Sequence, residues 1–181
     1  MTFQSIVQHW CRIYKPILDN PAKGDRRFFL TDSTAGVVEM VKNVSNKQSP
    51  FVLMESDVEL DGKMCLPYRN YPIYFFVRAN KMNDGDEAAV AKEEAWWHAR
   101  NFLTYLRAKH DEELAQNING DFSRIDLDVH LMVSTVGPME NGWYGILVQF
   151  EREEPVGLCI DGDLYCSPED DEEEGTDTTG S

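Results

Sequence analysis

The residues best suited to acid–base chemistry lie in one short run that contains Asp126, Asp128 and His130. Alternate residues of a strand point to the same side, so a histidine beside two carboxylates could exchange protons with a substrate there. A solvent-facing side of a strand carries the same residue types without any reaction, and this is the simpler interpretation. The other histidines lack the HxxxH or ExxH spacing that presents two zinc ligands together. An enzyme that uses His130 is therefore one alternative for the function.

A second pattern could bind a metal ion. Asp57, Glu59, Asp61 and Gly62 match the first half of a calcium-binding loop, in which oxygen ligands alternate before a glycine. The twelfth position of that loop would be Tyr68, which cannot supply the bidentate carboxylate. The four cysteines are scattered and form no CxxC pair, which is typical of free thiols in a reducing cytoplasm. We therefore expect no metal, no cofactor and no catalytic group.

Hydrophobic periodicity indicates the elements that hold these residues. A helix is predicted over residues 2–15, where apolar residues recur at steps of three and four, with Thr2 as its cap. Residues 26–31 are typical of a short strand, and the valines between 37 and 44 indicate a brief helix. Residues 51–60 and 71–79 are predicted strands that a tight turn at Asp61–Gly62 joins. The second of them is rich in aromatic and β-branched residues, so we expect it at the centre of a sheet.

Two more strands are predicted in the second half of the chain. Residues 125–133 alternate between apolar and polar types, which indicates one continuous strand. The segment from Gly137–Pro138 to Asn141–Gly142 is predicted to connect it to a strand over residues 143–151. Residues 155–166 then form either an edge strand or an arm.

A long helix is predicted between these strand pairs. Asp84 and Glu87 provide an acidic start, and the Asn119–Gly120 pair favours an end roughly 30 residues later, after about 45 Å. Small and apolar residues repeat at steps of three and four along one side, at Ala88, Ala91, Ala95, Ala99, Phe102 and Leu106. That stripe is expected to be buried. Val90 and Trp97 point roughly away from it, so they either contact another subunit or lie beneath another helix.

The sum of these elements predicts an α+β fold. A mainly antiparallel sheet is packed by an N-terminal helix and one long central helix, within a single domain over residues 1–166. Residues 167–181 contain seven acids and no base, which predicts a disordered acidic tail. Low hydrophobicity and like charge make that tail either a solvated segment or an interaction segment.

The charge and hydropathy of the sequence limit the classes of partner that we expect for this protein. The formal net charge is −15, and the chain without its last 15 residues still has 25 acids and 17 bases. Such a surface repels the phosphate backbone, so we expect no sequence-specific nucleic acid as a partner. No run of 18 apolar residues occurs and the first residues lack a signal-peptide pattern, so we expect neither secretion nor a membrane span.

The order of the predicted elements, residues 2–15, 51–79, 84–117 and 125–151, resembles the tail-terminator and tail-completion proteins of tailed bacteriophages. The resemblance covers about residues 1–155 and involves no catalytic motif. It implies a compact α+β subunit that assembles as a ring, commonly a hexamer, and joins the tail tube to the head connector. It also implies a place in the virion tail or neck after assembly in the bacterial cytoplasm.

We therefore expect a non-enzymatic virion structural protein. Its subunit contacts are predicted to use hairpin loops and exposed aromatic residues, with Val90, Trp97, Trp143 and Tyr144 as the interface candidates. Polar faces that could line an acidic lumen are predicted at Asp57, Glu59, Asp126 and Asp128. The alternative is a cytoplasmic acidic adaptor or inhibitor whose tail binds a basic partner.

Overall fold

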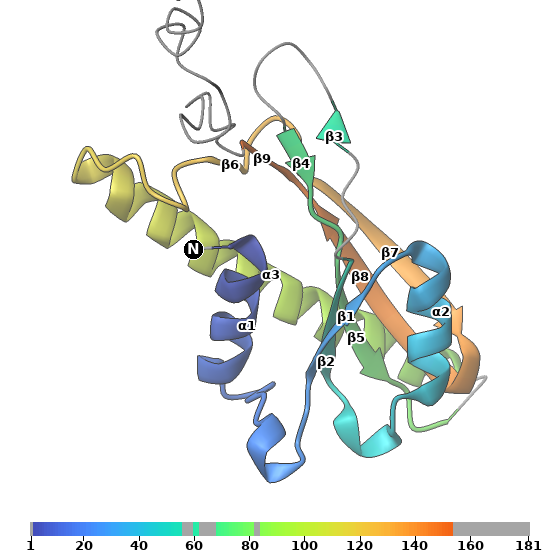
Figure 1. The fold of residues 1–181 in the computed structure, drawn as a ribbon. Helices are drawn as coiled ribbons and strands as arrows, with labels where there is room; N and C mark the ends of the chain where they lie inside the picture. Colours follow the sequence, from blue (N-terminus) through green and yellow to red (C-terminus); the bar gives the residue numbers. More distant parts are fainter. Residues whose placement is uncertain (1, 56–59, 62–67, 82–83, 154–181) are drawn as a thin grey trace, which may run out of the picture.

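The larger sheet of the fold has five strands in the order β1-β2-β5-β8-β7 (Figure 1). The computed structural model describes residues 2–55, 60–61, 68–81 and 84–153. The strands are β1 (Phe28–Thr31), β2 (Phe51–Glu55), β5 (Ile73–Arg78), β7 (Met132–Met139) and β8 (Trp143–Gln149). β1 is parallel to β2, and every other pairing is antiparallel. The predicted α+β class and the central place of β5 are thus confirmed.

A smaller sheet extends one end of the larger one. Its order is β3 (Leu60–Asp61), β4 (Tyr68–Asn70), β9 (Glu151–Glu153) and β6 (Ile125–Asp126). Because β4 leads into β5 and β9 follows β8, the two sheets share continuous stretches of chain. The prediction of a tight turn at Asp61–Gly62 is wrong, because Asp61 pairs with Tyr68 and residues 62–67 lie between them.

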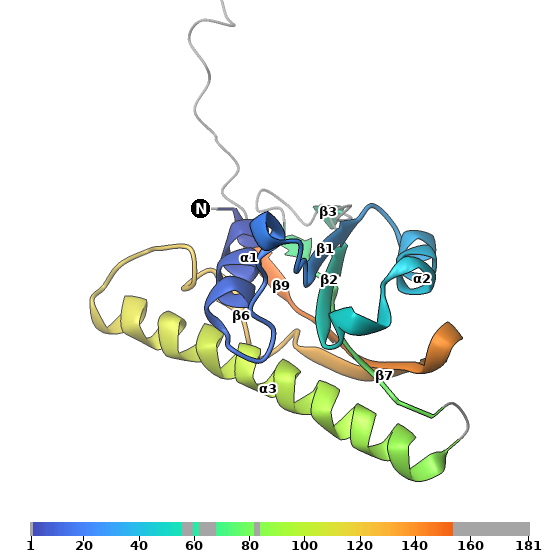
Figure 2. The ribbon, with the colours of Figure 1, turned by 90° about the horizontal axis from the view of Figure 1, so that it is seen from below.

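Helices α1 (Phe3–Ile13) and α3 (Gly85–Ala115) pack on one face of the larger sheet (Figure 2). Thr2 caps α1 by accepting a hydrogen bond from the Ser5 amide, and Pro16 follows its end as expected. The shared core contains Phe3, Ile6, Val7 and Trp10 of α1, Ala95, Ala99, Phe102 and Leu106 of α3, and Val52, Ile73, Phe75 and Val148 of the sheet.

The 31 residues of α3 span about 46 Å. The Asp84 side chain caps the helix by accepting hydrogen bonds from the amides of Asp86 and Glu87. The stripe of alanines lies against the sheet, where small side chains allow the two backbones to approach closely. The predicted start, length and buried side of this helix are confirmed.

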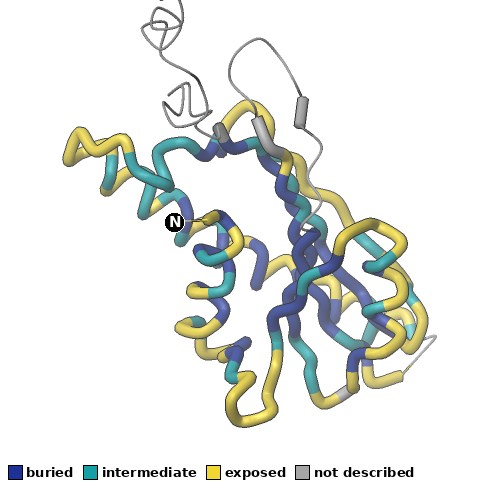
Figure 3. The backbone as a smooth tube through the Cα atoms, in the orientation of Figure 1, coloured by how far each residue is buried: buried dark blue, intermediate teal, exposed yellow. Residues whose placement is uncertain are grey.

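The opposite face of the sheet is covered by α2 (Thr34–Asn43). Val37 and Val41 pack there on Phe51, Phe76 and Trp143, which makes a second apolar cluster. Figure 3 shows the consequence, since the buried backbone runs through the middle strands between the helices. Short 3-10 turns complete the described elements at η1 (Pro21–Lys23), η2 (Asn46–Gln48) and η3 (Glu140–Gly142).

Residues 125–133 do not form the single strand that their alternation predicts. Ile125 and Asp126 pair with β9 in the smaller sheet, and β7 begins only at Met132. The backbone turns between them because the Asp126 carboxylate accepts hydrogen bonds from the amides of Asp128 and Val129. Gly137 and Pro138 belong to β7, so the connection to β8 is shorter than predicted and consists of Glu140–Gly142.

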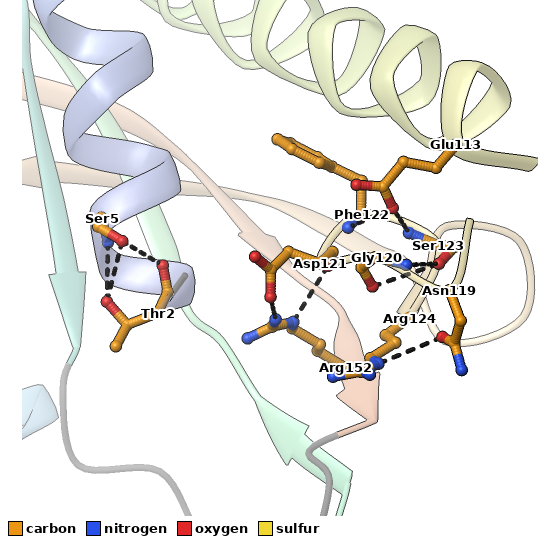
Figure 4. A network of polar contacts seen from close by, with 10 residues as sticks. All are labelled: Thr2, Ser5, Glu113, Asn119, Gly120, Asp121, Phe122, Ser123, Arg124 and Arg152. Atoms are coloured by element: carbon orange, nitrogen blue, oxygen red, sulfur yellow. Dashed lines mark hydrogen bonds and ion pairs between the residues drawn. The ribbon is translucent and has the colours of Figure 1, made fainter. Parts of the chain in front are cut away.

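Polar contacts fix the loop that returns from the end of α3 (Figure 4). The Glu113 carboxylate accepts hydrogen bonds from the backbone amides of Phe122 and Ser123, at 2.9 and 2.8 Å. Nη2 of Arg152 on β9 lies 2.8 Å from Oδ1 of Asp121 in the same loop. The loop is thereby held between the last turn of α3 and the smaller sheet.

The predicted edge strand or arm at 155–166 and the predicted acidic tail at 167–181 lie outside the described residues. The domain boundary at residue 166 therefore stays a prediction.

Candidate assembly surface

Three bulky apolar side chains lie on the solvent side of the first half of α3. Val90 is 64 % exposed, Trp96 43 % and Trp97 50 %. They lie there because the alanine stripe occupies the buried side of the helix, and a spacing of seven residues aligns Val90 with Trp97. We call these three residues the α3 face. Exposed tryptophans close together on one helix are typical of a surface that contacts another molecule.

A groove lies between the first half of α3 and strand β7. It has a volume of about 630 Å³, and its lining includes Lys92 and Trp96 of α3, Val133 and Thr135 of β7, and Ile146 of β8. Lys92 is oriented by the ring of Tyr144, whose centroid lies 5.4 Å from Nζ. The groove continues the apolar character of the α3 face onto the sheet.

Strand β7 forms the outer edge of the larger sheet in the described part of the chain. Its sequence, MVSTVGPM, contains no charged residue, and Met132 is 65 % exposed. Natural edge strands commonly carry lysine or inward-facing charges that prevent pairing with another chain. Pro138 and a register shift between Val136 and Met139 interrupt the far end of β7, so residues 132–136 form the uncharged edge that is suited to contact with a second polypeptide.

The structure separates the four predicted interface residues into two pairs. Val90 and Trp97 belong to the exposed α3 face, and the Trp97 ring lies 6.1 Å from that of Tyr14. Trp143 and Tyr144 are buried, so the expectation that they offer surface to another subunit is corrected. β8 lies between β5 and β7 with helices on both faces, which leaves Trp143 against Phe51 under α2 and Tyr144 under α3.

Of the predicted acidic faces, the structure describes Asp126 and Asp128. Asp57 and Glu59 lie outside the described residues. Asp126 and Asp128 do not share a strand side, because the chain turns after Asp126. The carboxylate of Asp128 forms an ion pair with Arg107 of α3, and that pair holds the pKa of Asp128 below its usual value. Backbone hydrogen bonds from the turn, followed by contact with His130, likewise lower the pKa of Asp126.

His130 lies beside carboxylates in an exposed position. Its Nδ1 atom is 2.8 Å from Oδ2 of Asp126 and 3.5 Å from Oε2 of Glu151. Asp126 also holds the turn through backbone amides, so it acts as a structural carboxylate. Among the residues that the structure describes, no three histidine, cysteine or acidic side chains are grouped as a metal ion would require.

A buried histidine, His98, lies next to the α3 face, with its ring centroid 5.2 Å from that of Trp97. Its Nδ1 atom lies 3.1 Å from the Tyr14 hydroxyl, whereas Nε2 is 3.6 Å from Glu94 and has no hydrogen-bond partner in the described part of the chain. Burial lowers the pKa of His98 from 6.5 to about 4. Burial, with a smaller contribution from Glu94, raises the pKa of Tyr14 to about 12. Both side chains are therefore neutral at pH 7 and connect α1 to α3.

The low pKa of His98 predicts that acid weakens the fold. Above pH 6.5 the imidazole is neutral in the folded and unfolded states and contributes no pH dependence. As pH falls from 6.5 to 4, the unfolded chain takes up the proton first, and the free energy of unfolding drops by about 3 kcal/mol. Urea denaturation between pH 7 and pH 4 measures this drop. His98→Phe should lose this part of the pH dependence, and an identical slope in both chains would contradict the assignment.

Trp96, Met132 and Val133 are surface residues that sequence reasoning missed. The exposure of Trp96 could have been predicted from the sequence, because helix geometry places it 100° from Trp97 and off the alanine stripe. The exposure of Val133 could not have been predicted, because its alternation with polar residues is typical of the buried side of a strand. Its exposure follows from the position of α3, which packs on β5 and β8 and leaves β7 uncovered.

No protein-family model and no curated protein matches the chain. Among the helices of the described residues, none has the length and hydropathy that a transmembrane span requires.

Proposed function

We propose that this chain is a non-enzymatic structural protein of a tailed phage or prophage virion, which forms a ring that terminates the tail or joins it to the head. The observation that carries the proposal is the α3 face beside the uncharged edge strand β7. An apolar helix surface and an open sheet edge together favour contact between subunits over chemistry on a small molecule.

The arrangement of the subunit supports a ring. In the described chain β7 is one edge of the larger sheet and β1 is the other. The two edges differ, because β1 pairs in parallel with β2 and β7 pairs antiparallel with β8. In a head-to-tail contact, one surface of a subunit binds a different surface of the next. Both ends of the growing assembly then keep an unoccupied surface, so further subunits add until the assembly closes. The order of the helices and strands supports the phage assignment through its resemblance to tail-terminator proteins. Six subunits, with the tail tube and the head connector as partners, follow from that resemblance.

The mass of the full-length protein in solution tests this proposal, together with averaged electron micrographs of the same sample. We expect a closed ring with a central hole at micromolar concentration. A chain that remains monomeric at high concentration, and is absent from purified phage particles, would refute the function.

A substitution on the α3 face should weaken the assembly. Val90→Lys places a charge in the proposed contact, and we expect at least about a tenfold loss of association because burying an unpaired ammonium group is unfavourable. Sedimentation velocity across a concentration series measures the change. Val38→Lys is the matched control, since Val38 is also an exposed valine, on α2 on the other side of the sheet. Equal effects of the two substitutions would argue against the α3 face as the contact.

A further inference from the structure

We infer that the α3 face of one copy binds residues 12–27 of the next copy, through opposite charges that surround apolar contacts. Residues 12–27 comprise the last two residues of α1 and the chain that links it to β1, and we call them the connection. The inference rests on the proposed ring and names the two surfaces that would form it. Its occupant is therefore a second copy of this chain.

The α3 side of this contact is acidic. Residues 84–94 contain five acids and one base, so the apolar α3 face begins in a region of net negative charge. Asp86 and Glu93 are exposed, and no ion pair involves either carboxylate in the described part of the chain. Lys92, the single base, is already held over the Tyr144 ring. Two exposed carboxylates therefore flank Val90 and form no ion pair among the described residues. Arg78 lines the same pocket as Asp86 and Val90, but its Nε donates to the Asn141 carbonyl.

The connection between α1 and β1 has the opposite charge, although the chain as a whole is strongly acidic. Residues 12–27 contain five bases and two acids. Both acids are engaged inside the segment, because Asp19 is buried and accepts hydrogen bonds from the amides of Arg27 and Phe28, and Asp25 pairs with Arg27. Arg12 and Lys15 are exposed, and neither forms an ion pair within the described residues.

Apolar side chains project from this basic segment. Ile13 is 53 % exposed and lies between Arg12 and Lys15 in the sequence. Leu18 is 51 % exposed and follows three residues after Lys15. Leu18 has a φ of 46°, a left-handed backbone conformation that a bulky residue rarely adopts. Such backbone strain is concentrated at functional positions, because the fold must compensate for it elsewhere. The segment therefore presents leucine and isoleucine among positive charges, which complements valine and tryptophan among negative charges.

The two surfaces meet at one point on a single subunit, because the ring of Tyr14 in the connection lies 6.1 Å from that of Trp97 on the α3 face. From there they diverge. The connection leads into β1 at one edge of the larger sheet, whereas the groove beside Trp96 lies against β7 at the other edge. Figure 2 shows the first half of α3, which carries Val90, extending away from the connection. The rest of each surface is therefore open to a second copy, and contact between the two repeats around a ring.

Charge reversal in the full-length chain tests this pairing. Asp86→Lys with Glu93→Lys makes the α3 side basic, and Arg12→Glu with Lys15→Glu makes the connection acidic. We expect each double variant to associate at least about tenfold more weakly than the wild type, because like charges then meet in every contact. An equimolar mixture of the two variants should recover large assemblies, because every contact between unlike variants again joins opposite charges. Mass photometry measures all samples, and thermal melting verifies that each variant is folded.

The control reverses two charges outside both surfaces, as Asp32→Lys with Glu39→Lys beside and on α2. It should assemble like the wild type. Double variants that assemble normally, or a mixture that does not recover assembly, would overturn the inference. The proposed function would still stand in that case if the wild type forms a ring. A two-fold dimer as the largest wild-type species would overturn the head-to-tail arrangement, and a monomeric wild type would overturn the ring as well.

Discussion

Trp143→Ala is expected to lower the free energy of unfolding by about 3 to 5 kcal/mol. The indole of Trp143 is fully buried, and its ring centroid lies 4.9 Å from that of Phe51 in the cluster beneath α2. Truncation removes a large apolar surface and leaves a cavity that the surrounding strands cannot fill. Chemical denaturation followed by circular dichroism measures the loss.

Comparison with Trp96→Ala distinguishes a loss of stability, expected for a core tryptophan, from a loss of association, expected for a surface tryptophan. Trp96 is partly exposed on α3, so its truncation should cost much less stability while weakening association. Trp143→Ala should leave association unchanged at temperatures where the variant is folded. A stable Trp143 variant that fails to assemble would restore Trp143 as an interface residue.

Arg152→Ala is expected to cost a similar amount, about 3 to 5 kcal/mol. The Arg152 side chain is only 3 % exposed, and it joins β9 to the loop that carries Asp121. Removing the guanidinium leaves a partly buried carboxylate without that cation and opens the contact between the loop and the smaller sheet. Urea denaturation of the folded variant measures the loss.

Arg107→Ala is the matched control for this substitution. Arg107 also pairs with an aspartate, Asp128, but both side chains of that pair are largely exposed, at 42 % and 72 %. Exposed pairs contribute roughly 0 to 1 kcal/mol because water and salt screen them. Equal losses in the two variants would show that burial does not determine the strength of these pairs.

The sequence predicted the helices well because each carries its own local signals. In α3 the Asp84 cap and the alanine stripe agree on where the helix starts and which side is buried. In α1 the cap at Thr2 and Pro16 beyond the end agree in the same way. Such signals depend on neighbours three or four residues apart, so a single sequence contains them in full.

The sequence failed where contacts between distant residues decide the outcome. The alternation of residues 125–133 predicts one strand, yet the hydrogen bonds of Asp126 to the following amides turn the chain before β7. Aromatic residues such as Trp143 have the same pattern whether they face a core or a partner. Their burial depends on α2 and α3, which cover opposite faces of the sheet and whose positions a periodicity does not encode.

The uncharged edge strand β7 has a consequence for free subunits. Each copy displays that strip until neighbours cover it, while the net charge of −15 keeps copies apart at long range. At physiological ionic strength this repulsion decays over about 8 Å, so it slows encounters without preventing close approach. Subunits that fail to close into a ring should therefore precipitate on concentration, and they should stay in solution longer at low ionic strength.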